Sequence, residues 1–312
     1  MSTVYPSAIN SLEDYLEAVQ AVYDACITHV DHDYQFDDFD ATIRLHYVKF
    51  DGDGRPKFKA LAHALVDHII LFCIAATQRT NPLTTTENSR LFRKARDLFR
   101  KLDKAGEPGE ILLYFLLETV LKAPQIVCKM SLKTNPGEEV KGGDGIHASW
   151  DEKNERLNLY LGEAKLYKNF GDALVAAFDS IDKFYSTNAD EHELSLVTAH
   201  FKHSDNNLKQ CISNYLDNSN PIGSYRTHHA CLIGYDWYKY KELNNSNPKK
   251  FIDNFEAHYV KHANKLVKKA KALLGLSSQQ HLAFEFFFVP FMKVQDFRDE
   301  FNKALMGDGG GS

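Results

Sequence analysis

Three charged residues stand at spacings that suit metal-dependent hydrolysis of a phosphodiester. Asp144 lies between glycines, and Glu163 and Lys165 end the alternating run LNLYLGEAK. Because side chains in a strand alternate between its two faces, Glu163 and Lys165 share a face with the three leucines of this run. Leucines on one face indicate burial, and a buried face tolerates charges only where they are compensated. The pattern therefore predicts a functional site at the end of this strand.

The chemistry of that site follows from its donor atoms. A hairpin between the two segments would bring Asp144 close to Glu163, and two neighbouring carboxylates repel each other unless a cation lies between them. Oxygen ligands of this kind favour Mg²⁺ or Mn²⁺. Such an ion polarises a phosphoryl oxygen and lowers the pKa of a bound water, while Lys165 orients that water or neutralises charge in the transition state. We therefore expect Mg²⁺ as the cofactor, with Mn²⁺ as a substitute and no small-molecule cofactor.

The order of these residues, D-x18-E-x-K after a helix that carries a glutamate, resembles the PD-(D/E)XK nuclease superfamily. Further strings resemble a narrower group, the HamA family of nuclease subunits in the Hachiman anti-phage defence system. The motif match covers roughly residues 109–182, and Asp144 departs from the superfamily name because it follows a glycine instead of a proline. The strings that carry the resemblance are GEILLYFLLE at 109–118, KMSLKTN at 129–135, GGDGIH at 142–147, LYLGEAK at 159–165 and FFFVPF at 286–291.

The resemblance implies a role for each site residue. Asp144 and Glu163 would bind the metal together with the carbonyl of Ala164, and Lys165 would be the catalytic lysine. Glu110, from the first helix of the core, would complete the metal site. Glu110 also fits a simple helix start, because the helix dipole favours acids in the first turn. Glu118, later in the same helix, is then the alternative metal ligand.

The resemblance also implies an activity and a partner. It predicts a DNA nuclease with little sequence specificity, controlled by a superfamily 2 helicase that either loads it on DNA or restrains it. A rival interpretation is a catalytically decayed nuclease fold that acts as a scaffold for the helicase, although the intact D…ExK set argues against decay. A second rival is an RNase of the same fold, because hydrolysis of either backbone needs the same metal site.

Other candidates are less specific. His147 would line the cleft only if its strand bulges, since three residues separate it from Asp144. Lys129 could reach a phosphate or lie on a solvated surface. The basic helix predicted at 88–104 could contact a DNA backbone, where binding is mostly phosphate neutralisation, but a solvated helix face and a docking surface for an acidic partner are equal alternatives. Its candidate DNA contacts are Arg90, Arg93, Lys94, Arg100 and Lys101.

The elements that must position the site indicate an α/β fold. Helical and strand patterns alternate after residue 109, which predicts a mixed central β-sheet flanked by helices, a PD-(D/E)XK restriction-endonuclease-like core, with a mainly helical N-terminal region. The patterns include an amphipathic helix at 9–29 and a strand at 125–134. The break AGEPG suggests three parts. They are an N-terminal region at 1–105, a nuclease core at 106–306 and a flexible tail at 307–312.

Composition restricts the possible partners and compartment. The net charge of −5 provides no global attraction to nucleic acid, so DNA must meet a local basic patch. Five scattered cysteines without a CxxC pair argue against a zinc cluster or a disulfide framework. No apolar stretch is long enough for a transmembrane helix, and the start lacks the order of a signal peptide. We expect a bacterial cytoplasmic protein with no membrane partner.

Overall fold

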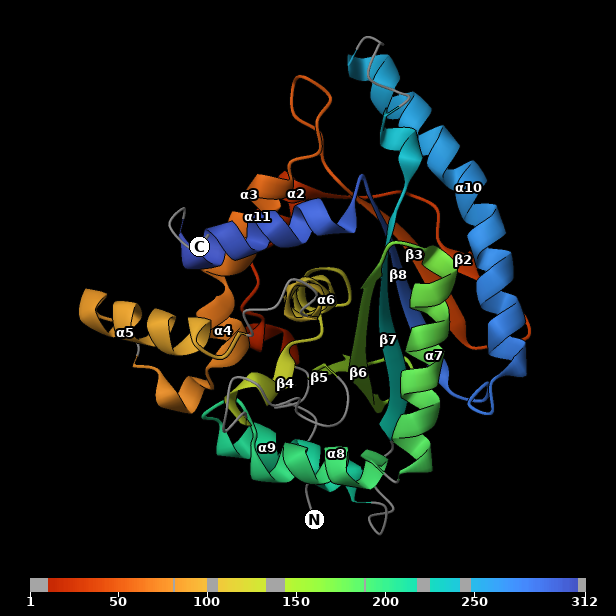
Figure 1. Ribbon diagram of the computed structural model, residues 1–312. Helices are drawn as coiled ribbons and strands as arrows, with labels where there is room; N and C mark the ends of the chain where they lie inside the picture. Colours follow the sequence, from red (N-terminus) through yellow and green to blue (C-terminus); the bar gives the residue numbers. More distant parts are fainter. Residues whose placement is uncertain are drawn as a thin grey trace.

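A computed structural model describes residues 11–80, 82–99, 106–132, 144–187, 189–217, 225–241 and 248–307. It confirms the α/β fold with a mixed central sheet flanked by helices (Figure 1). Within these residues the sheet has eight strands in the order β1-β3-β8-β7-β6-β5-β4, and β2 pairs with β3. The strands are β1 (Ile27–His29), β2 (Tyr34–Gln35), β3 (Ala41–Val48), β4 (Gln125–Val127), β5 (Ile146–Asp151), β6 (Arg156–Tyr167), β7 (Tyr225–Asp236) and β8 (Ala283–Phe291).

Helices cover both faces of this sheet. Figure 1 shows α6 near the centre, seen almost end on, with the sheet curving round it and α7 and α10 on the sheet's outer side. The α-helices are α2 (Gln20–Cys26), α3 (Phe58–Asp67), α4 (Ile69–Cys73), α5 (Thr85–Arg96), α6 (Glu107–Val120), α7 (Phe170–Ser186), α8 (Ala189–Ala199), α9 (Asn206–Leu216), α10 (Pro248–Leu276) and α11 (Val294–Met306). Short 3₁₀ helices are η1 (Leu12–Tyr15), η2 (Ala76–Gln78), η3 (Lys129–Leu132) and η4 (Tyr238–Lys241).

The middle of the sheet is parallel and buried on both faces. Strand β7 pairs in parallel with β6 on one side and β8 on the other, and β8 pairs in parallel with β3. A strand that is covered on both faces needs apolar side chains at nearly every position. The sequences ACLIGY on β7 and FFFVPF on β8 have this pattern. None of the described helices combines the length and apolarity needed to span a bilayer.

Strand β6 alternates as its sequence predicts. Leu157, Leu159 and Leu161 pack in the same cluster as residues of α8 and α9. Tyr160 and Leu166 belong to the cluster on the opposite face, with α6. The antiparallel hairpin between β5 and β6 is also confirmed, with Ile146 opposite Leu161.

Two predicted elements differ from the structure. The helix predicted at 9–29 is wrong over most of its length, because η1 and α2 are short and Ile27–His29 forms strand β1 against β3. The strand predicted at 125–134 ends at Val127 and continues into η3. The basic helix begins at Thr85, where Thr84 and Glu87 form a capping box, and ends at Arg96.

The N-terminal region takes part in the same sheet as the core. Strand β3 pairs with β8 from Ala41–Phe284 to Leu45–Phe288. The boundary after residue 105 stays a prediction and lies in the undescribed stretch at 100–105. The pairing of β3 means that the two regions share one hydrogen-bonded layer. The tail at 308–312 lies outside the described residues.

Candidate active site

The ladder between β5 and β6 extends far enough to place Asp144 beside Glu163. Beyond the Ile146–Leu161 pair, the Gly162 N–H donates to the Gly145 carbonyl at 3.0 Å. The Asp144 N–H then donates to the Gly162 carbonyl at 2.7 Å. Both bonds use Gly162 but different residues of the other segment, so the ladder is irregular at its end, and Asp144 lies next to the stretch Gly162–Ala164 that carries Glu163.

The Asp144 carboxylate is fixed by the backbone of β6. Its Oδ2 accepts a hydrogen bond from the Ala164 N–H at 2.6 Å. The carboxylate thus occupies the place where the next strand carbonyl would bind, and a charged acceptor makes a stronger bond than a neutral one. This bond holds the side chain of Asp144 toward β6 while its second oxygen keeps its capacity to bind a cation.

Glu163 and Lys165 form an ion pair on the same strand. The Lys165 Nζ lies 2.6 Å from the Glu163 Oε1, and the two side chains are 21% and 13% exposed. Burial works against the charged ammonium, but attraction to Glu163 and Asp144 outweighs it and raises the pKa of Lys165. Lys165 is therefore a cation at neutral pH, reachable from solvent and next to the carboxylates.

Three carboxyl groups interact at this point. Burial raises the pKa of Asp144 well above its ordinary value, and the negative charges of Glu110 and Glu163 raise it further. The Ala164 N–H and the Lys165 ammonium act in the opposite direction. Glu110 therefore lies near enough to Asp144 for their charges to interact, and its part in a metal site stays a prediction.

A close approach of α6 to β6 accounts for the position of Glu110. A Cβ added at Gly109 would lie 3.3 Å from the Ala164 Cβ and 3.1 Å from the Leu166 Cγ. One at Gly162 would lie 3.1 Å from the Leu113 Cδ2. Glycines at both contacts let the first turn of the helix rest directly on the strand. Glu110, the next residue after Gly109, is thereby carried to the site.

The donor set suits a hard divalent cation. Carboxylates from Asp144, Glu163 and Glu110 are oxygen ligands, and the repulsion that raises the pKa of Asp144 is what a bound cation would relieve. Across the described ranges, no three His, Cys, Asp or Glu side chains already stand in a metal-binding arrangement. Glu163 contacts Lys165 instead. The residues present therefore fit Mg²⁺ or Mn²⁺ if Glu163 exchanges part of its lysine contact for the ion.

Three other residues predicted for the site are buried in the protein. His147 is buried, and its Nδ1 lies 2.8 Å from the Ala123 carbonyl, which ties β5 to the end of α6. Lys129 is buried in η3. Glu118 is buried and accepts the N–H groups of Glu17 and Ala18 at 2.8 and 2.7 Å. These contacts give His147 and Glu118 structural roles, and a further part of either residue in an active-site cleft stays a prediction.

The basic helix α5 is accessible to a partner. Arg90, Arg93 and Lys94 are exposed, and Lys94 Nζ donates to the Gln78 Oε1 at 2.7 Å. Arg100 and Lys101 lie outside the described residues. Contact between this helix and DNA stays a prediction.

Sequence reasoning missed one neighbour of the site. Cys231 on β7 is directly in register with Glu163, is fully buried, and belongs to the core beneath α7. Burial, followed by the charge of Glu163, raises the pKa of its thiol well above the usual value. The thiol is therefore protonated, and it places a small apolar group beside Glu163 on the neighbouring strand. Nothing local to Cys231 signals this, because the parallel pairing of β6 and β7 joins distant segments.

Buried neutral histidines predict acid sensitivity of the fold. Burial lowers the pKa of His147 and His229 to about 3, and of His203 and His228 to about 4. An unfolded histidine titrates near 6.5, so below that pH the unfolded state binds protons that the folded state does not. Stability should be complete at pH 7 and should fall toward pH 5, by up to about 1.4 kcal/mol per pH unit for each histidine.

Urea denaturation at pH 7, 6 and 5 measures this loss. His147→Gln should reduce the slope of the unfolding free energy against pH, whereas His258→Gln, at an exposed position on α10, should leave it unchanged. An unfolding free energy that is flat between pH 7 and pH 5 would contradict the assignment of neutral buried rings.

Comparisons with known proteins agree with the resemblance found in the motifs. A family model described as HamA matches residues 22–305, nearly the whole chain. A comparison with curated proteins found no match. The matched range includes Glu110, Asp144, Glu163 and Lys165, and extends well to either side of the motif region at 109–182. The chain therefore belongs to the HamA family and is a component of a Hachiman defence system.

Proposed function

We propose that this chain is a Mg²⁺-dependent nuclease with a PD-(D/E)XK-type site, and that its substrate is DNA cut with little sequence specificity. The observation that carries the proposal is the convergence of Asp144, Glu163 and Lys165 at the end of the β5–β6 hairpin, with Glu110 brought in by α6. The residue types, their order and their mutual electrostatics suit phosphodiester hydrolysis. A decayed fold would have no reason to keep mutually repelling carboxyl groups in a half-buried position.

Each residue has a distinct role in the proposed reaction. Asp144, oriented by the Ala164 N–H, and Glu163 would hold the ion together with the Ala164 carbonyl, and Glu110 would support it from α6. The bound ion would supply Lewis-acid polarisation of the phosphate and acidify a water. Lys165 would release Glu163 and turn its ammonium to the attacking water or to the negative charge that grows on the phosphate. Cys231 would keep water away from the inner side of Glu163.

Membership of the HamA family supports the proposed partner and setting. We place the nuclease under the control of the helicase subunit of the same system, because an unrestrained nuclease of low specificity would damage the host. All five cysteines lie in the described part of the chain, are buried and form no disulfide, which suits the reducing bacterial cytoplasm.

The activity can be tested with the purified chain, alone and with its helicase. Supercoiled plasmid should be degraded with Mg²⁺ or Mn²⁺ and remain intact with EDTA. A matched RNA duplex in the same reaction separates a DNase from an RNase. If no nucleic acid is cut under any of these conditions, with or without the helicase, while the helicase still binds the chain, the scaffold function replaces the nuclease.

A further inference from the structure

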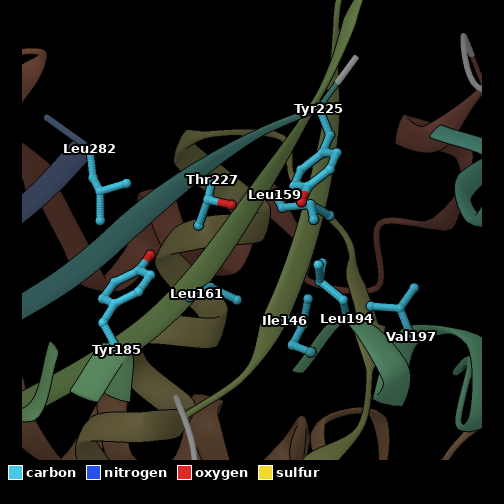
Figure 2. A pocket seen from close by; sticks show the side chains of 9 residues that line it. All are labelled: Ile146, Leu159, Leu161, Tyr185, Leu194, Val197, Tyr225, Thr227 and Leu282. Carbon is cyan, nitrogen blue, oxygen red and sulfur yellow. The ribbon is translucent and has the colours of Figure 1, made fainter. Parts of the chain in front are cut away.

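A cavity opens on the sheet face that carries Glu163. It is lined by Leu161, the residue of β6 that precedes Glu163 on that face. Its volume is about 150 Å³, and its floor is formed by β5, β6 and β7. Tyr185 at the end of α7 and Leu194 on α8 form the walls (Figure 2). Several lining side chains, among them Leu194, Tyr225 and Thr227, are only half-buried, so the cavity is open to solvent.

The cavity lies next to the proposed catalytic residues along strand β6. Ile146 and Leu161 face each other across the hairpin and line the cavity. Leu161 lies two residues before Glu163 on the same strand, β6, and therefore on the same face of the sheet. Two residues of strand span about 7 Å. A phosphate held at the carboxylates would thus leave the base of its own or the adjoining nucleotide within reach of the cavity.

The lining has the chemistry of a base pocket. Aliphatic side chains and two tyrosine rings offer apolar and stacking surface, while hydroxyls of Tyr185, Thr227 and Tyr225 surround the same space (Figure 2). The Tyr185 Oη lies 2.9 Å from the His229 Nε2, which fixes its position. Apolar pockets with a few placed polar groups are typical of small-ligand sites, and a cavity of about 150 Å³ accommodates a single six-membered ring.

We propose that this cavity receives one unpaired pyrimidine base of the nucleic acid whose backbone is cut at Asp144 and Glu163. The proposal rests on the nuclease function and adds a substrate class, namely single-stranded or unwound DNA. A base inside a duplex cannot enter such a pocket without being flipped out of the stack, which costs a few kcal/mol. A base that is already unpaired enters at no such cost, and stacking on aromatic side chains is tolerant of sequence.

Binding without cleavage tests the pocket separately from the activity. The full chain, with Ca²⁺ in place of Mg²⁺, is titrated with labelled oligothymidylate of about 15 nucleotides and with an abasic oligomer of the same length. The two probes carry the same phosphates and differ only in their bases. We expect oligothymidylate to bind about 5- to 100-fold more tightly, the range that stacking of one base provides.

Two variants locate the effect. Leu194→Phe fills the cavity from α8 and should abolish the difference between the probes, whereas Val175→Phe, at a position of α7 that is 43% exposed and outside the cavity, should preserve it. Tyr225→Leu, which removes a ring at a half-buried position, serves if Leu194→Phe does not fold. Equal binding of the two probes to the wild-type chain, or equal behaviour of Leu194→Phe and Val175→Phe, overturns the pocket.

The two proposals fail in different ways. If the chain cuts plasmid with Mg²⁺ but binds both probes equally, the nuclease function is supported and the base pocket is contradicted. If the chain distinguishes the probes, and Leu194→Phe abolishes the difference, but no nucleic acid is ever cut, the pocket is supported as a binding site for single strands. The nuclease function is then contradicted.

Discussion

Lys165→Ala is expected to lower the rate of Mg²⁺-dependent plasmid cleavage by about 100-fold or more, with the fold unchanged. Loss of one charge-stabilising donor at a transition state commonly costs that much. The side chain is 21% exposed and forms an ion pair with Glu163, so its removal leaves no large cavity. Glu163→Gln should cause a comparable loss, because the amide keeps the size of the carboxylate but not its charge for the ion.

A neighbouring lysine supplies the matched control. Lys168, three residues further along, is exposed, and Lys168→Ala should cut plasmid at the wild-type rate. Initial rates on supercoiled plasmid, together with thermal melting of each variant, measure the effect. Equal rates for Lys165→Ala and Lys168→Ala, with both variants folded, would remove Lys165 from the chemistry.

Lys202→Met should destabilise the protein by about 3–5 kcal/mol, because it leaves buried carboxylates without their cation. Lys202 is fully buried and its Nζ lies 2.5 Å from the Glu17 Oε2 and 5.3 Å from the centre of the Tyr114 ring. Burial alone would raise the pKa of Glu17, but Lys202 and Arg79 lower it below its usual value, so the carboxylate is ionised and needs both cations.

The same cation influences α6 through Glu118. Burial raises the pKa of Glu118, and the charge of Lys202 is the strongest influence in the opposite direction. Urea denaturation at pH 7 measures the loss, with Lys268→Met on the exposed side of α10 as the control, for which a change within about 0.5 kcal/mol is expected. A loss for Lys202→Met no larger than that of the control would show that the buried ion pair contributes nothing to stability.

Local patterns were sufficient to predict that Asp144 and Glu163 lie near each other, and to predict several of the elements around them. The alternation of leucines predicts the faces of β6, and the glycine-flanked Asp144 predicts the hairpin that brings it to Glu163. Helix α6 and strands β7 and β8 are long, strongly apolar segments. The secondary structure of such segments can be predicted from their own sequence, without contacts from the rest of the chain. They confirm the predicted alternation of helices and strands after residue 109.

Elements whose type depends on a distant partner were mispredicted. Residues 27–29 have a helical pattern, yet they form β1 because β3 offers them hydrogen bonds. The strand after α6 ends at Val127, and Cys128 Sγ then bonds to the Phe72 carbonyl at 3.0 Å. Tertiary contacts override local propensity where the segment is short.

The sequence by itself determined which residue types meet at the candidate site, because strand alternation and a hairpin are local properties that a few consecutive residues specify. Only the tertiary structure decided what surrounds them: Glu110 beside Asp144, Cys231 beside Glu163, and Lys202 inside the protein against Glu17. These contacts join segments far apart in the chain. Their energies arise from burial, which weakens the screening of charges, and burial exists only once the sheet and its helices have assembled.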